Sequence, residues 1–211
     1  MIPAGGVTLP GDLSLPEHAQ SLVIFSHGNM SSRFSPRNRF VAKVLNENGM
    51  ATLLADLMTA KEDQDYPQHS TIELFTRRLL AITRWVLNLP ALKHLPIGYF
   101  GANTGAASAL KAAVTLPNHV QAIVARGGRV DLAQDDLPKI RIPVLMIVGS
   151  LDEPVIELND EAFEQMTCHR ELKIVWGASH FFEEPGKLDE VARLTVSWFE
   201  HYLVSNSQLV G

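Results

Sequence analysis

The sequence predicts an α/β protein of three layers, in which a mainly parallel central sheet lies between helices. Short apolar runs alternate with amphipathic stretches along the chain, as strands and helices do in such folds. One apolar run enters a Gly-x-Asn-x-Gly sequence at residues 101–105 and passes at once into an alanine-rich stretch, which indicates a strand, a sharp turn and a helix. Right-handed crossovers then place helices on both faces, and functional loops lie at the carboxyl ends of the strands.

The first part of the chain predicts an edge hairpin, a central strand and a helix. Residues 7–16 alternate around a Pro-Gly pair and favour an antiparallel hairpin at a sheet edge, where proline is tolerated. Residues 22–25 form an almost continuous apolar run, typical of a buried parallel strand. A Ser-Pro pair at 35–36 predicts the start of a helix, and an Asn-Gly pair at 48–49 predicts its end.

The later elements continue the alternation. Strands are expected at 51–55, in the run that begins at Ile97, and at 122–125, 144–148 and 172–176. Helices are expected at 72–86, 105–116, 156–168 and 188–202, with a polar loop at 59–69. The interval between the strands at 122–125 and 144–148 is too short for a separate helical cap domain, so the site should be open or covered only by loops.

Composition limits the classes of function. A chain of 211 residues, 46% of them hydrophobic, predicts a single domain over residues 1–211. A net charge of −5 without long runs of like charge argues against nucleic acid or an acidic membrane surface as a partner. The chain has no apolar segment of membrane-spanning length and no signal-peptide pattern, so a cytoplasmic protein that acts on a small molecule is expected. Cys168 is the only cysteine, so no internal disulfide is expected. Nothing in the sequence defines the oligomeric state.

The sequence Gly101-Ala102-Asn103-Thr104-Gly105 has the context of a nucleophile elbow. In such an elbow, flanking glycines let the central side chain stand clear at the top of a parallel sheet. Asn103 occupies this central position, where a serine or cysteine is expected in an active hydrolase. Asparagine tolerates the positive φ angle that an elbow imposes, so it preserves the fold without supplying a comparable nucleophile.

Two further strand ends carry side chains that fit a catalytic triad. Asp152 follows the strand at 144–148, and His180 follows the strand at 172–176, which gives the order nucleophile, acid, histidine. A histidine can take a proton from the nucleophile and return it to the leaving group, while an aspartate fixes the imidazole tautomer. The alternative for Asp152 is a simple helix cap, and for His180 a structural loop residue.

An oxyanion also needs two backbone N–H donors. In this chain they are expected to be the amides of Thr104, directly after the elbow residue, and of Asn29, in the loop after the first central strand. Thr104 begins a helix, where free amides and the helix dipole favour negative charge. Gly28 lets the second backbone approach closely.

Four motifs together resemble the α/β-hydrolase superfamily, and within it the small dienelactone-hydrolase-like group without a cap domain. The motifs are Ser26-His27-Gly28-Asn29, Gly101-Ala102-Asn103-Thr104-Gly105, Gly149-Ser150-Leu151-Asp152-Glu153-Pro154-Val155 and Gly177-Ala178-Ser179-His180-Phe181-Phe182. The resemblance covers nearly the whole chain and implies a three-layer α/β-hydrolase fold that cleaves carboxylic esters or lactones. The stretch 31–39 further resembles hydrolases of this group that are sometimes fused to phosphoribosyltransferases.

Asn103 leaves three explanations open. The chain is a serine hydrolase whose nucleophile was deliberately replaced, or a natural descendant that binds an ester or acid without cleaving it. In the third explanation catalysis is kept, either because His180 activates water directly or because the Asn103 amide hydrolyses to a carboxylate nucleophile. The sequence does not define the acyl or alcohol part of a substrate.

Arginines after two of the strands are candidates for binding an anionic part of the substrate: Arg33, Arg37 and Arg126, which Arg39 and Arg129 could join. Arginine suits carboxylates because its guanidinium forms two parallel hydrogen bonds. The alternative is a network of ion pairs with aspartates such as Asp56 or Asp131. No metal-ligand spacing, phosphate loop or dinucleotide fingerprint is present in the sequence, so no metal and no cofactor are expected.

Overall fold

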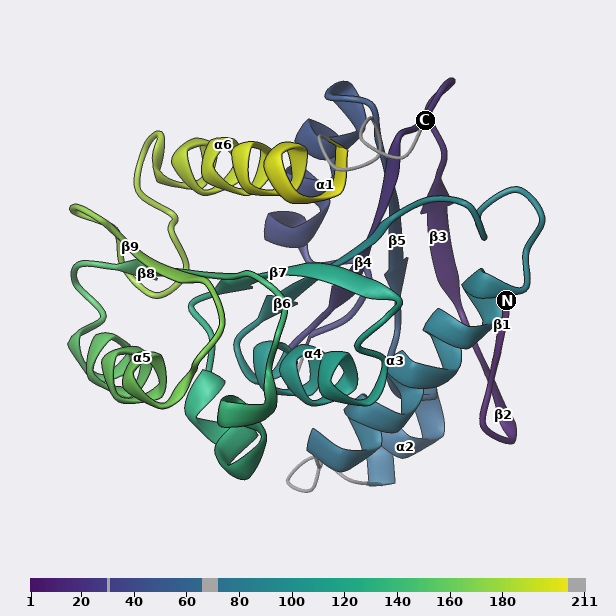
Figure 1. Cartoon of the computed structure of the whole chain (residues 1–211), viewed down its shortest axis with the longest axis horizontal. Coiled ribbons are helices and arrows are strands. Elements are labelled where there is room, and N and C mark those ends of the chain that lie inside the picture. The colour runs from purple at the N-terminus through teal and green to yellow at the C-terminus, as the bar shows by residue number, and fades with distance from the viewer. Residues whose placement is uncertain (30, 66–71, 205–211) are drawn as a thin grey trace.

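A seven-stranded sheet forms the centre of the protein, in the order β3-β5-β4-β6-β7-β8-β9. The computed structural model describes residues 1–29, 31–65 and 72–204 (Figure 1). The strands are β3 (Gly11–Ser14), β4 (Ser21–Ser26), β5 (Met50–Ala55), β6 (Ile97–Ala102), β7 (Val120–Arg126), β8 (Val144–Gly149) and β9 (Arg170–Val175). All neighbouring pairs are parallel except β3 and β5, which are antiparallel at one edge.

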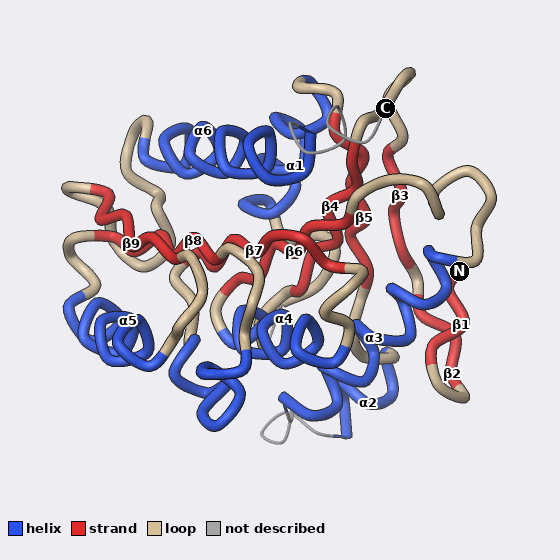
Figure 2. The backbone as a smooth tube through the Cα atoms, viewed as in Figure 1, coloured by secondary structure: helices blue, strands red, loops and turns tan. Residues whose placement is uncertain are grey.

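Helices cover both faces of the sheet, so the predicted three-layer α/β architecture is confirmed (Figure 2). One face carries α1 (Pro36–Glu47) and α6 (Lys187–Phe199), and a short π-helical turn, Glu200–Val204, follows α6. The other carries α2 (Ala60–Asp65), α3 (Ile72–Leu87), α4 (Thr104–Thr115) and α5 (Glu153–Gln165). A 3-10 segment, Val130–Lys139, connects β7 to β8 on that face, and no separate cap domain lies among the described residues between these two strands.

The core lies in two layers, one on each side of the sheet. Every residue of β4, β5, β6 and β8 is buried, which explains why these strands are largely apolar in the sequence. Val41 of α1 and Phe199 of α6 pack into one layer, whereas Leu79 of α3 and Leu110 of α4 pack into the other. Two filled layers hold the strand ends, and hence the loops that follow them, in fixed positions. Among the described residues, no helix is both long and apolar enough to cross a membrane.

The predicted hairpin at residues 7–16 is wrong in its pairing. β2 (Val7–Leu9) pairs with β1 (Ile2–Ala4) in a separate two-stranded ribbon, whereas β3 pairs with β5. Alternating polarity identifies both short strands and the sheet edge, but it does not specify a strand's partner.

The predicted loop at residues 59–69 is partly helical, since residues 60–65 form α2 and residues 66–69 lie outside the described residues. A reciprocal capping box starts this helix: the Thr59 amide donates to Glu62 Oε2 (2.8 Å), and the Glu62 amide donates to Thr59 Oγ1 (3.2 Å). The helix expected at 156–168 starts earlier, at Glu153, and ends at Gln165, because Pro154 occupies the first turn and favours an early start.

Candidate active site

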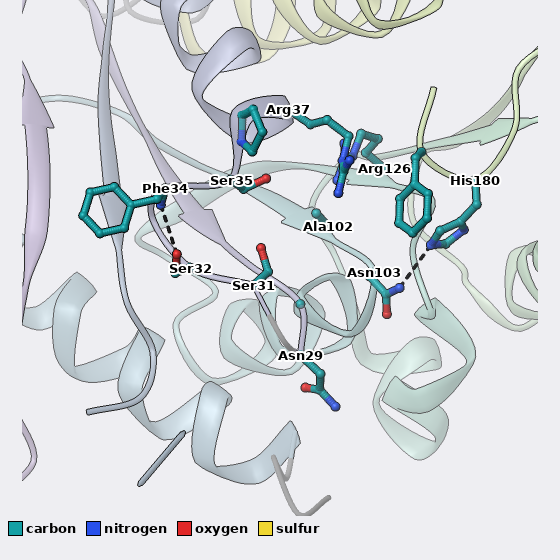
Figure 3. A pocket seen from close by; sticks show the side chains of 13 residues that line it. Asn29, Ser31, Ser32, Phe34, Ser35, Arg37, Ala102, Asn103, Arg126 and His180 are labelled. Atoms are coloured by element: carbon teal, nitrogen blue, oxygen red, sulfur yellow. Dashed lines mark hydrogen bonds between the residues drawn. The ribbon is translucent and has the colours of Figure 1, made fainter. Parts of the chain in front are cut away.

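The turn between β6 and α4 holds Asn103 in a conformation that few residues adopt. Its φ is 52° and its ψ is −127°, and it forms the N-cap of α4. Glycines on both sides are required by space: a Cβ on Gly101 would lie 2.5 Å from the Ala106 Cα, and one on Gly105 would lie 2.1 Å from the Ser26 carbonyl oxygen. The Gly-x-Asn-x-Gly sequence therefore forms a sharp elbow with the central side chain directed into a cavity (Figure 3).

Gly105→Ala is expected to lower the free energy of unfolding by more than about 2 kcal/mol. The added Cβ would overlap backbone atoms of Ser26 and His27, which cannot move aside without shifting β4. Urea unfolding followed by circular dichroism measures the change. Thr115→Ala, at the exposed end of α4, serves as the control and should change the free energy by less than about 0.5 kcal/mol. Equal unfolding midpoints for the two variants would contradict this packing.

The structure brings Asn103, Asp152 and His180 together, although they are far apart in the sequence. His180 Nδ1 lies 2.6 Å from Asp152 Oδ2. On its other side, His180 Nε2 lies 3.1 Å from Asn103 Nδ2, and Figure 3 shows this second contact. Gly149 allows the loops after β8 and β9 to meet, since a Cβ there would lie 2.3 Å from the Ala178 carbonyl oxygen. The imidazole thus bridges the acid and the elbow residue.

Glu184 positions the loop that carries His180, and the sequence analysis did not identify it. Both carboxylate oxygens of Glu184 accept the Ser179 amide N–H at 3.1 Å, and hydrogen bonds from Ser179, first from its side chain and then from its backbone, lower the pKa of Glu184. A glutamate four positions after a histidine has no distinctive sequence pattern, so only the folded loop reveals this contact.

The two amides predicted to bind an oxyanion both have acceptors within the protein. The Thr104 amide donates to Asn103 Oδ1 at 2.6 Å, and the Asn29 amide donates to the Thr104 hydroxyl at 3.0 Å. The Thr104 hydroxyl in turn donates to Asn29 Oδ1 at 3.1 Å. The Thr104 amide is therefore already bonded to the Asn103 carboxamide oxygen, and the Thr104 side chain links the elbow to the loop after β4.

His27 holds the loop after β4 in place. Its Nδ1 lies 2.9 Å from the Gly28 carbonyl oxygen, and its Nε2 accepts the Leu57 amide N–H at 2.9 Å. Burial lowers the pKa of His27, so the ring stays neutral with its proton on Nδ1. The arrangement supports the interpretation of His27 as a residue that shapes the loop.

A cavity of about 550 Å³ opens beside Asn103 and His180. Its lining includes Phe34, Arg37, Arg126 and Phe181, and the two arginines reach into the same part of it (Figure 3). Arg126 is 8% exposed, and none of the described residues accepts a hydrogen bond from its Nε or Nη1. Burial and the neighbouring Arg37 charge lower the pKa of Arg126 to about 10.

The structure does not bring Arg33 to this cavity. Its guanidinium pairs with Asp56, and its amide donates to Asp56 Oδ1 at 2.7 Å, as in the ion-pair alternative. Arg37 combines both interpretations, since it lines the cavity and also donates to Glu183 at 3.0 Å.

Within the described part of the chain, no three His, Cys, Asp or Glu side chains gather as a metal site requires.

Comparison with known proteins gives a family and a set of solved structures. The sequence model of the Dienelactone hydrolase family matches residues 16–203. A dienelactone hydrolase from Anabaena variabilis is 48% identical, with a TM-score of 0.93 over 96% of this chain and 95% of that one. A Xanthomonas campestris protein described as an α/β serine hydrolase without a lid is 20% identical, with a TM-score of 0.75 over 92% of this chain and 89% of that one.

The curated relatives are longer proteins. One from Mycobacterium tuberculosis, whose name assigns it provisionally as a phosphoribosyl transferase, is 46% identical over 200 residues. The match covers 95% of this chain and 45% of the relative, so the chain spans less than half of the relative's length.

Proposed function

Because the chain belongs to the dienelactone hydrolase family and has the capless α/β-hydrolase fold, we propose that it is a serine-type hydrolase scaffold for carboxylic esters or lactones. Asn103 occupies the nucleophile position in this proposal, with His180 as the base and Asp152 as the acid. The transferase name belongs to longer relatives of which the match covers 45%, whereas the hydrolase family model matches residues 16–203 of this chain.

One observation carries the proposal: a single imidazole contacts both other members of the expected triad. Each nitrogen of the His180 ring has a hydrogen-bond partner: Nδ1 lies 2.6 Å from Asp152 Oδ2, and Nε2 lies 3.1 Å from Asn103 Nδ2. A proton relay needs a partner on each side of the ring, one at the nucleophile position and one that is the acid, and His180 has both.

With serine at position 103, the geometry supports acyl transfer. The serine oxygen would attack the acyl carbon while His180 Nε2 takes its proton and Asp152 stabilises the imidazolium. The amides of Thr104 and Asn29 would then bind the oxyanion. The Thr104 amide becomes free once the Asn103 carboxamide is absent, and the Asn29 amide becomes free if the Thr104 hydroxyl turns away.

The second candidate function is that of a non-catalytic small-molecule-binding protein. The observation that favours it is the side chain of Asn103, which is not a nucleophile and which accepts the hydrogen bond of the Thr104 amide. A binding protein of this kind would use the same cavity without forming a covalent intermediate.

Covalent labelling distinguishes a hydrolase scaffold with a working proton relay at His180 from a non-catalytic binding protein. We expect the Asn103→Ser variant, but not the unchanged chain, to form an adduct with an alkyl fluorophosphonate, because His180 activates the new hydroxyl. Intact-mass spectrometry detects the adduct, and peptide mapping locates it. A folded variant that remains unlabelled would argue for the binding protein.

The buried Arg126 and the neighbouring Arg37 suggest a substrate class within this proposal. Arg126 is 8% exposed, and two of its guanidinium donors have no acceptor among the described residues, which is costly unless a ligand supplies an anion. Arg37 lines the same cavity and adds a second positive charge. We therefore propose esters or lactones that carry a carboxylate away from the scissile bond.

In the Asn103→Ser background, Arg126→Met should reduce kcat/KM about 10- to 100-fold for an anionic ester, because a hydrogen bond to a charged group is lost. The p-nitrophenyl half-ester of a short dicarboxylic acid is a suitable substrate, and p-nitrophenyl butyrate is its neutral counterpart. Arg129→Met is the matched control, since Arg129 pairs with Asp131 at 2.9 Å outside the cavity lining. Equal losses for the anionic and the neutral ester would contradict a carboxylate subsite.

A further inference from the structure

We propose that Asn103 is a modification site, at which the protein hydrolyses its own side-chain amide to aspartate and releases ammonia. The inference rests on the proposed function for the roles of His180 and Thr104. Its readout is the chemical identity of residue 103, however, and not the turnover of an ester.

The first supporting observation is that the carboxamide is held as a substrate amide would be. Asn103 Oδ1 accepts the Thr104 amide N–H at 2.6 Å, at the N-terminus of α4. A short hydrogen bond at a helix N-terminus polarises a carbonyl and stabilises negative charge on its oxygen. The site thus directs its own donor at the Asn103 carbonyl.

The second observation is the position of the amide nitrogen. Since the Thr104 N–H requires an acceptor, the oxygen of the carboxamide faces Thr104 and the nitrogen faces His180, with 3.1 Å between Nδ2 and Nε2. Asp152 holds the opposite ring nitrogen at 2.6 Å, which keeps a proton on Nδ1 and a lone pair on Nε2. The same Nε2 can therefore take a proton from water and later pass it to the leaving nitrogen.

The chemical step uses one water molecule from the cavity that Asn103 and His180 line. The water oxygen forms a bond to Asn103 Cγ while His180 Nε2 takes one of its protons, and the carbonyl electron pair moves onto Oδ1. The Cγ–Nδ2 bond then breaks, and the nitrogen takes the proton from His180 and leaves as ammonia. The new carboxyl group loses its remaining proton to solvent, so water and amide give carboxylate and ammonium.

The charges around the cavity favour the product. Arg37 and Arg126 line the same cavity as Asn103, and two donors of Arg126 have no acceptor among the described residues. Two neighbouring cations stabilise a carboxylate more than a neutral amide. A carboxylate at position 103 would also be a nucleophile, which a carboxamide is not.

The test is a time course of intact mass on the purified full chain, in ordinary water and in heavy-oxygen water. We expect a gain of about one mass unit in ordinary water and about three in heavy-oxygen water, from the exchange of NH₂ for one solvent oxygen. Peptide mapping against the Asn103→Asp variant as a standard should locate the change at residue 103. Asn159, which is buried and donates to the Gly128 and Val155 carbonyls, is the internal control and should remain an amide.

His180→Ala should slow the conversion about 100-fold or more, because both proton transfers run through that ring. Asp152→Asn is a second variant in case the first does not fold, and circular dichroism checks both. The proposal would be overturned if Asn103 remained an amide in the unchanged chain. It would also be overturned if a folded His180→Ala or Asp152→Asn variant converted Asn103 as fast as the unchanged chain. A product with isoaspartate would also overturn it, because that product arises by attack of the Thr104 nitrogen and not of water. Ester hydrolysis by Asn103→Ser does not involve this amide, so either result can fail alone.

Discussion

Asn103→Ser is expected to raise kcat/KM for a short p-nitrophenyl ester by at least about 10³-fold over the unchanged chain. The serine hydroxyl would lie within reach of His180 Nε2, which already contacts the side chain at this position at 3.1 Å. The substitution also removes the carboxamide oxygen from the Thr104 amide, so that an oxyanion donor becomes free at the same time. Initial rates at saturating and limiting ester concentrations measure the gain.

Asn103→Ala is the matched control for this gain. It frees the Thr104 amide just as serine does, but it supplies no nucleophile, so its rate should stay near that of the unchanged chain while residue 103 is still an amide. Residual activity in either protein is expected to be small, since a site without its nucleophile retains only the contributions of oxyanion binding and substrate positioning. Equal rates for the serine and alanine variants would contradict a working relay at His180.

Asp152→Asn, introduced into the Asn103→Ser variant, is expected to reduce kcat by about 10⁴-fold with little change in KM. The 2.6 Å contact between Asp152 Oδ2 and His180 Nδ1 keeps the proton on Nδ1 and leaves Nε2 as the base. An asparagine can donate to Nδ1 and so favours the wrong tautomer, while the ring stays in place.

Asp160→Asn is the control for that loss, because Asp160 lies on the exposed side of the same helix, α5. It should leave kcat unchanged. The alternative role of Asp152 as a simple helix cap predicts that Asp152→Asn keeps its activity, since asparagine is an equally good N-cap residue. Asp152 makes no side-chain hydrogen bond to the backbone of α5, which agrees with a role at His180.

The sequence predicts the sheet and its loops well because burial on both faces leaves a strong pattern. The fully buried strands β4, β5, β6 and β8 all lie in largely apolar runs. The pairing of β2 and β3 was wrong, because short strands with alternating polarity specify a face but not a neighbour. The helix α2 was missed although Thr59 and Glu62 have the spacing of a capping box.

Parts of the candidate site could be read from strand ends, and parts could not. Asn103 and Asp152 each follow a buried strand, and His180 follows the partly buried edge strand β9, so the order of the strands predicts that the three residues meet. The sequence could not show which arginine lines the cavity. In the folded chain Arg33 pairs with Asp56, whereas Arg126 lines the cavity. The internal partners of the Thr104 and Asn29 amides depend on side-chain rotamers, which a sequence pattern does not encode. The prediction of one domain over residues 1–211 stays a prediction.

A crystal structure of the Asn103→Ser variant carrying the phosphonate adduct tests the central claim most directly. We predict that the phosphoryl oxygen lies about 3 Å from the amide nitrogens of Thr104 and Asn29, and that His180 Nε2 faces the bond to the new serine oxygen while Nδ1 still contacts Asp152. An adduct whose phosphoryl oxygen points into solvent, or whose His180 ring has left Asp152, would contradict the account.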